Sequence, residues 1–171
     1  MRRLLCFAAL AGAAFAVAVV GESTLRFDDL TTMPLEQVIV PDLNTGAPVQ
    51  LVSNDQYTAW GGTLEAPSGE YAVAESTFII RSSTANGIDL KSLYVAPFEP
   101  TFLYGNVPQA TSVKVVWFDA NDVELDSQTF PLTLGYKQLK VKMKRAAYVV
   151  VFGNGDGSAP LLIDNVKLHQ H

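Results

Sequence analysis

Short runs in which apolar residues alternate with polar ones, or in which β-branched residues follow one another, occupy most of the chain after residue 24. Runs of this length and period predict β-strands with one or both faces buried. Turn signals such as NTG, PSG, ANG and NGDG separate them. About eight strands are predicted, at residues 25–30, 77–81, 88–96, 113–119, 139–144, 148–153 and 161–168, together with the second arm of a hairpin at 117–130.

The predicted hairpin and the lack of further helical segments narrow the choice of fold class. We expect its turn at Asp119–Asp122, because Asp and Asn side chains bond their own backbone and tolerate left-handed φ values. Beyond the N-terminal segment, no stretch combines helical periodicity with capping residues. An all-β chain without helices to cover a sheet closes as a sandwich or a barrel. We therefore predict one antiparallel, jelly-roll-like β-sandwich domain over residues 22–168, followed by a C-terminal tail at 169–171.

The N-terminal segment predicts export. Residues 1–3 read MRR and precede an apolar run rich in Ala, which ends with the small residues Ala16, Ala18 and Gly21. This pattern is typical of a secretory signal peptide, here assigned to residues 1–21, with the mature chain starting near residues 19–24. A membrane anchor is the alternative, because the run approaches the roughly 20 residues that span a bilayer. We favour secretion and expect no membrane association after cleavage, since no second run of that length follows.

Loss of the signal peptide changes the composition. Removal of residues 1–21 leaves 150 residues and shifts the formal net charge from −5 to −7, because it takes away Arg2 and Arg3 but no acidic residue. An acidic surface repels phosphate backbones, so we expect no nucleic-acid partner. Cys6, the single cysteine, leaves with the signal peptide, so we expect no disulfide in the mature domain. About 150 residues can bury a sufficient core without one.

Several segments, taken in order, resemble a known class of domain. These are FDDL near the start, YTAWGG, TFIIRS followed by GIDLKSLYVA, VVWFDANDVELDSQTF, and VVVFGNGDGSAPLLIDNV at the end. Over residues 25–168 this layout resembles secreted jelly-roll domains of the carbohydrate-binding-module or galactose-binding-like type, in which a strand containing an Asp-Asn pair between apolar residues closes the fold. The resemblance implies a noncatalytic sugar binder, and a structural calcium ion near the paired terminal strands.

The Asp164-Asn165 pair lies inside the apolar run of the last predicted strand. If the first and last strands are neighbours, Asp28 or Asp29 can approach Asp164, and such carboxylates repel unless a cation or a proton lies between them. Calcium suits such a site, because it takes six to eight oxygen ligands. The alternative is that these aspartates cap local turns or lie on an exposed edge, with Asn165 bonding backbone amides.

Aromatic residues in predicted loops are the candidate ligand-binding residues. The loop NDQYTAWGG at 54–62 places Tyr57 and Trp60 beside Asn, Asp and Gln, a mixture that can stack on a sugar ring and bond its hydroxyl groups. The segment 98–108 adds Tyr104. The alternative for each ring is that it plugs an end of the sandwich.

The residue patterns that could indicate an active site are weak evidence for catalysis, and we predict no catalytic residue. Asp122, Glu124 and Asp126 alternate after a tight turn, where acids more often form a solvated face than a glycosidase pair. Both histidines, His169 and His171, are expected beyond the last strand, so no core imidazole can serve a catalytic triad. Four further acids are unassigned candidates for a carboxylate mechanism: Glu65, Glu70, Glu75 and Glu99.

Three functions are therefore compatible with the sequence. The first is a secreted, extracellular, noncatalytic carbohydrate-binding protein whose partner is an extracellular or cell-wall polysaccharide. The second is a secreted effector or structural β-sandwich that binds another protein. The third is a glycosidase that uses carboxylates alone. The first follows most directly from the resemblance and the loop aromatics.

Overall fold

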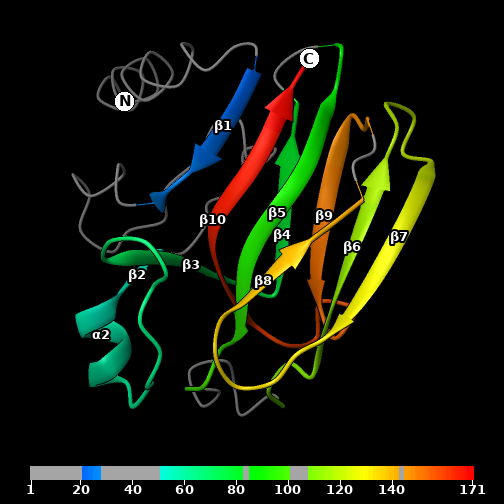
Figure 1. The fold of residues 1–171 in the computed structure, drawn as a ribbon. Coiled ribbons are helices and arrows are strands. Elements are labelled where there is room, and N and C mark those ends of the chain that lie inside the picture. Colours follow the sequence, from blue (N-terminus) through cyan, green and yellow to red (C-terminus); the bar gives the residue numbers. More distant parts are fainter. Residues whose placement is uncertain (1–20, 28–50, 83–84, 101–107, 143–144) are drawn as a thin grey trace, which may run out of the picture.

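The computed structural model describes residues 21–27, 51–82, 85–100, 108–142 and 145–171. Their strands form two antiparallel sheets that pack face to face as a β-sandwich (Figure 1). The six-stranded sheet contains β1 (Gly21–Leu25), β2 (Leu51–Ser53), β3 (Tyr71–Glu75), β5 (Ile88–Pro97), β8 (Lys137–Lys140) and β10 (Leu161–Gln170). The four-stranded sheet contains β4 (Thr77–Arg81), β6 (Ser112–Phe118), β7 (Glu124–Pro131) and β9 (Tyr148–Gly153).

The strand orders place the two ends of the described chain together. The six-stranded sheet has the order β2-β3-β10-β5-β8, and β1 pairs with β10 along the edge that β3 also uses. The four-stranded sheet has the order β4-β9-β6-β7. The predicted β-sandwich is confirmed, as is the premise that the first and last strands are neighbours.

The core between the two sheets explains why the alternation of apolar and polar residues predicted the strands. Inward residues of the four-stranded sheet, such as Phe78, Val115, Trp117 and Val149, are fully buried against inward residues of the other sheet, such as Ile163. Close packing of this kind removes apolar surface from water, and each Å² removed stabilises the folded state by about 25 cal/mol. Strands with one face in such a core show the period of two that the sequence displays.

A second apolar cluster covers the outer face of the six-stranded sheet. Its buried members are Val52, Tyr57, Ala72, Ala74, Ala96, Phe98 and Leu162, with Trp60, Leu64, Ala66 and Tyr136 packed against them. Three of the buried residues on the strands are alanines, which leave room for aromatic rings to lie on the sheet. This cluster explains why Ala96 of β5 and Leu162 of β10 are buried although they do not belong to the main core.

The structure differs from the predicted strands in several places, among them the strand predicted at 139–144, which is β8 at Lys137–Lys140. The first strand is at 21–25 rather than 25–30, because its outward residues Glu22 and Thr24 are exposed and polar and gave no apolar signal. The short strand β2 and the alanine-rich β3 were not predicted, since alanine has a weak strand preference. The last strand runs to Gln170 and so includes two residues of the predicted tail.

The described residues contain no helix long and apolar enough to cross a membrane. Their longest helical element is α2 (Asn54–Ala59), of six residues. Residues 1–20 lie outside the described part of the chain, so the signal peptide stays a prediction.

Candidate functional site

The segment predicted as an aromatic loop contains the helix α2. Ser53 caps its start, where the Ser53 hydroxyl oxygen accepts a hydrogen bond from the backbone N–H of Gln56 at 3.2 Å. A Ser followed three residues later by Gln is a known signal for a helix start. The expectation of a loop was therefore wrong, because a helix of six residues is too short to show the apolar period on which that expectation relied.

Two glycines form the hydrogen-bonded C-terminal end of α2. Gly61 has a left-handed φ of +86°, and its N–H bonds the carbonyl of Thr58 at 2.9 Å. The N–H of Gly62 bonds the carbonyl of Tyr57, also at 2.9 Å. This pair of bonds is a Schellman motif, which favours glycine at the left-handed position. A Cβ at Gly62 would lie 2.2 Å from the Tyr57 ring, so this position also requires glycine.

Tyr57 is a packing residue of the second cluster. Only 2% of the residue is exposed, and its ring lies edge-to-face against Phe98 with 5.3 Å between centroids. Its hydroxyl oxygen accepts from the backbone N–H of Glu99 at 2.8 Å and donates to Glu99 Oε2 at 3.4 Å. Burial raises the pKa of the Tyr57 phenol above its ordinary value. Both ring faces lie in the protein, so Tyr57 presents no stacking surface.

Trp60, by contrast, is half-buried and forms the C-cap of α2. Its ring centroid is 6.5 Å from that of Phe98, which anchors the indole at the margin of the cluster. Part of the side chain therefore reaches solvent from a fixed helical position.

Glu99 lies beside this helix end and is held by three donors. Its Oε2 accepts from the backbone N–H of Thr63 at 2.6 Å, and its Oε1 accepts from the Thr63 hydroxyl at 2.9 Å. The Tyr57 hydroxyl is the third donor. We call the surface formed by Trp60, Thr63 and Glu99 the α2-end site. Sequence analysis left Glu99 unassigned and gave no signal for Thr63, because the two residues are 36 positions apart.

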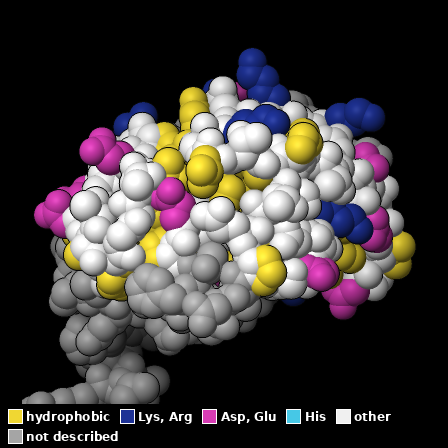
Figure 2. Space-filling model, turned by 90° about the horizontal axis from the view of Figure 1, so that it is seen from below, with side chains coloured by type: hydrophobic (Ala, Val, Ile, Leu, Met, Phe, Trp, Pro, Cys, Tyr) yellow, Lys and Arg dark blue, Asp and Glu magenta, His cyan; other side chains and the backbone are white. Residues whose placement is uncertain are grey.

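Figure 2 views the molecule from below Figure 1, the end where α2 lies. Hydrophobic side chains reach this face among polar side chains, and acidic groups lie toward both the left and the right of the view. An aromatic ring among polar groups suits a hydrophilic ligand more than a broad apolar partner. Tyr104 belongs to residues 101–107, which lie outside the described residues, so its predicted place in the site stays a prediction.

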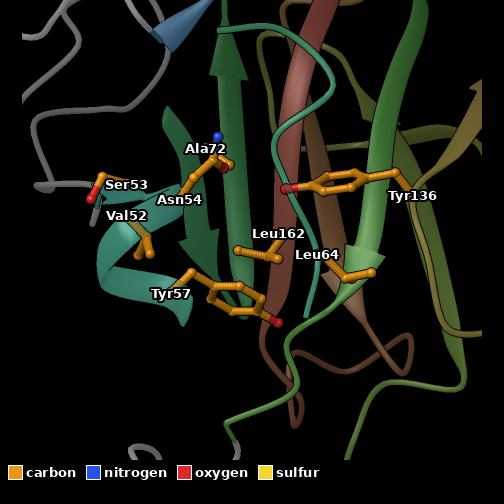
Figure 3. A pocket seen from close by; sticks show the side chains of 8 residues that line it. All are labelled: Val52, Ser53, Asn54, Tyr57, Leu64, Ala72, Tyr136 and Leu162. Atoms are coloured by element: carbon orange, nitrogen blue, oxygen red, sulfur yellow. The ribbon is translucent and has the colours of Figure 1, made fainter. Parts of the chain in front are cut away.

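A small pocket is lined by residues of α2 and of neighbouring strands of the six-stranded sheet (Figure 3). It is lined by Val52, Ser53, Asn54, Tyr57, Leu64, Ala72, Tyr136 and Leu162, and its volume of about 10 Å³ is close to the minimum for one water molecule. A sugar ring cannot enter it. Burial, followed by the nearby charge of Asp164, raises the pKa of the Tyr136 phenol above its ordinary value.

Asp164, a predicted metal ligand, is fully buried and accepts hydrogen bonds from its surroundings. Ser68 donates to it through its backbone N–H at 2.9 Å and through its hydroxyl at 3.0 Å. The backbone N–H of Asn165 donates to Asp164 Oδ1 at 2.6 Å. Asn165 has a left-handed φ of +48° in an irregular stretch of β10 between Asp164 and Lys167. Only the bond from Asn165 is local, as the alternative to calcium expected; the Ser68 donors come from 96 residues earlier, and burial excludes an exposed edge for Asp164.

The calcium hypothesis itself stays a prediction. Asp28 and Asp29 lie outside the described residues. The part of the chain that the structure describes holds no group of three or more Asp, Glu, His or Cys side chains arranged to bind a metal ion. Calcium also takes backbone carbonyl and water oxygens, so this finding leaves the hypothesis untested.

The histidines occupy ordered positions rather than a tail. His169 lies within β10, and the ring Nε2 of His171 is 2.8 Å from Asp89 Oδ2. The Arg145 guanidinium lies 2.8 Å from Nδ1 of the same ring. Because Arg can only donate, His171 Nδ1 accepts and its Nε2–H donates to Asp89. This cluster lies at the C-terminal end of β10, away from α2 (Figure 1).

The acidic hairpin forms the predicted turn. Asp119 Oδ1 accepts from the N–H groups of Asn121 and Val123 at 2.7 and 2.9 Å, and Asp122 adopts a φ of +62°. Glu124 and Asp126 follow on β7, the edge strand of the four-stranded sheet. Asp126 pairs with the inward residue Trp117, whereas Glu124 pairs with the outward residue Phe118 across a bulge. The two acids therefore do not share one face of the strand. Strict alternation had predicted that they would.

Comparisons with known proteins confirm the fold. No protein-family model matches the sequence. No curated protein matches it either. The structure is similar to a DUF4465 family protein from Bacteroides caccae, with a TM-score of 0.60 and 12% identity over 88% of this chain and 99% of that one. It is also similar to the K2 cleaved adhesin domain of Lys-gingipain, with a TM-score of 0.52 and 15% identity over 87% of this chain and 99% of that one.

A further solved structure, a xylan-binding domain of CBM 22, matches at a TM-score of 0.47 and 12% identity over 88% of this chain and 95% of that chain. The two stronger matches span nearly the whole length of their own domains. The chain thus has the β-sandwich fold that its resemblance to carbohydrate-binding domains implied.

Proposed function

We propose that this protein is a secreted, noncatalytic, carbohydrate-binding-module-like protein that binds extracellular or cell-wall glycan through the α2-end site. The observation that carries the proposal is the half-exposed Trp60 indole, fixed at a capped helix end beside a held Glu99 carboxylate. Aromatic rings stack on the apolar faces of sugars, and carboxylates accept hydrogen bonds from sugar hydroxyl groups.

The surroundings of Glu99 favour binding over catalysis. Three protein donors already orient its carboxylate, so it is suited to a fixed acceptor role. A glycosidase needs a second carboxyl group at about 5–10 Å across the scissile bond. The similarity to an adhesin domain, an attachment module by its name, supports an extracellular binding role. A protein ligand is the second candidate, since adhesins as a class need not bind sugars.

The test is a Trp60→Ala variant of the secreted protein. Because part of the indole is exposed, we expect urea unfolding to shift by no more than about 1–2 kcal/mol, below the 3–5 kcal/mol typical of a fully buried Trp. Retention on insoluble polysaccharides should fall at least tenfold, since one stacked ring often dominates a small site. Trp60→Phe should keep part of the retention.

Tyr94→Ala is the matched control, because Tyr94 is also half-buried but lies in the middle of β5. This control should bind as the unchanged protein does. Full retention by Trp60→Ala would reject the α2-end site. Failure of the unchanged protein to bind any polysaccharide, with capture of a defined protein ligand instead, would favour the second candidate.

A further inference from the structure

The outer face of the four-stranded sheet carries a regular pattern of charge and aromatic rings. The sheet forms one side of the sandwich, while α2 packs beside β2 of the other sheet (Figure 1). Strand pairing arranges the outward residues in three rows across β4, β9, β6 and β7. The first row reads Arg81, Tyr148, Phe118 and Glu124.

The first row is rigid in the middle and oppositely charged at its ends. The Arg81 guanidinium lies 4.5 Å from the centroid of the Tyr148 ring, a cation–π contact. The Tyr148 ring stacks on Phe118 with 4.8 Å between centroids and 10° between planes. Arg81 and Glu124 are both exposed, on the two edge strands of the sheet.

The second row is mostly apolar and reads Ile79, Val150, Val116 and Ser127. Val116 and Val150 are only 2% and 5% exposed, although they point away from the main core. Neighbouring side chains of the face therefore shield them from water. Together the two rows place stacked rings and shielded valines between a positive edge at Arg81 and a negative edge at Glu124.

We propose that a second copy of this chain packs on this face, about a two-fold axis parallel to the strands between β9 and β6. Such an axis exchanges the strand order, so that β4 lies over β7 of the partner copy and β9 lies over β6. Arg81 of each copy then faces Glu124 of the other, which gives two such ion pairs. Tyr148 of each copy faces Phe118 of the other. Val150 faces Val116 in the second row. The pattern is thus complementary to itself, as a two-fold interface requires.

The third row is compatible with the same axis. It reads Thr77, Phe152, Lys114 and Thr129, so the axis places the two threonines opposite each other and Lys114 over Phe152. No pair of like charges meets in any of the three rows. Stacked sheets align at roughly 30°, which displaces the row ends by a few ångströms. The long side chains of Arg81 and Glu124 can span this displacement.

The size of the face sets the expected affinity. Four strands about 4.8 Å apart and about 20 Å long give a face of roughly 400 Å². A standard interface buries about 800 Å² on each partner, and this face offers about half of that, so we expect a weak, transient dimer. The apolar residues Val123 and Leu125 lie at the Glu124 end of β7, 55% and 42% exposed, and can extend the rim.

Sedimentation velocity and light scattering on the secreted protein from about 1 to 300 µM test the proposal, since a weak, transient dimer forms only toward high concentration. We expect the mean mass to rise from one chain toward two, and the rise to weaken at high salt because rim ion pairs are screened. Arg81→Glu should weaken dimerisation at least tenfold by opposing two acids. The swap Arg81→Glu with Glu124→Arg should restore it.

Lys140→Glu is the control, because Lys140 is exposed on β8 of the other sheet and the change in charge is the same. It should dimerise normally, and melting curves should show that all variants fold. A protein that stays monomeric at 300 µM overturns the proposal. So does a dimer that Arg81→Glu leaves intact, or one that the charge swap fails to restore. Trp60→Ala should show the same concentration-dependent mass as the unchanged protein. A failure of the glycan-binding proposal therefore does not affect the test of dimerisation.

Discussion

At the scale of single residues, buried polar groups connect distant segments across the six-stranded sheet. Asp164 is fully buried on β10, and Ser68, 96 residues earlier, donates two hydrogen bonds to its carboxylate. Glu99 receives similar donors from Thr63. Leaving the buried Asp164 carboxylate unsatisfied would cost roughly 1–3 kcal/mol, whereas Glu99 is only partly buried. These contacts therefore hold the segment between α2 and β3 on the sheet.

The calcium hypothesis predicts a measurable response at Asp164. If Asp28 or Asp29 and Asp164 share a calcium ion, the melting temperature should rise with added calcium and fall with a chelator, since a ligand that binds only the folded state stabilises it. Asp164→Ala should be less stable and should lose that response. Unchanged melting in both calcium and chelator, together with the bonds from Ser68, would leave the aspartate with a purely structural role.

A second prediction concerns Tyr136. Its phenol has a raised pKa in the folded protein because burial disfavours the phenolate, whereas the unfolded chain has a Tyr pKa of about 10. The unfolded state therefore loses its proton first, so the stabilisation is full below pH 10 and is lost progressively as the pH rises above it. Urea unfolding of the unchanged protein should show this loss as the pH rises above about 10. Tyr136→Phe, which keeps the ring, should show a shallower loss.

At the scale of elements, the sequence predicted those with local signals. The hairpin turn at Asp119 was found because Asp side chains bond their own backbone, and this bonding is confirmed at 2.7 and 2.9 Å. The helix α2 was missed although Ser53 and Gln56 form a start signal and Gly61 a stop signal. Six residues between these signals are too few for periodicity to register. Capping residues were thus the better guide here.

The helix cap gives a prediction at this scale. Ser53→Ala removes the hydroxyl acceptor for Gln56 N–H and should destabilise the protein by about 0.5–2 kcal/mol in urea unfolding. Ser53→Asp should retain most of the stability, because Asp is also a good N-cap. Since α2 carries Trp60, we expect Ser53→Ala to weaken polysaccharide retention as well. Equal stability of Ser53→Ala and the unchanged protein would show that α2 does not depend on its cap.

At the scale of the whole molecule, the sandwich was predictable, whereas of the α2-end site the sequence indicated Trp60 but not its combination with Thr63 and Glu99. Alternation is a local property, so most strands and the all-β class could be read from the sequence. The site depends on Thr63 meeting Glu99 and on Tyr57 meeting Phe98, contacts that only the packing of α2 on the alanine-rich outer face creates. Single-sequence patterns carry no such information.

The joining of the chain ends gives the last prediction. Strand β1 pairs with β10 along Gly21–Leu25, and Glu22 forms ion pairs with Lys91 and Lys167. If the signal peptide ends near residue 21, the mature chain keeps this strand, and mass spectrometry of the secreted protein should find its first residue between 19 and 24. Deletion of residues 1–25 should then lower the melting temperature by roughly 5 °C or more relative to deletion of 1–21, because 1 kcal/mol corresponds to about 2–4 °C in a chain of this size. It should also promote aggregation, since it exposes the edge of β10. Equal melting of the two proteins would show that β1 contributes nothing to the fold.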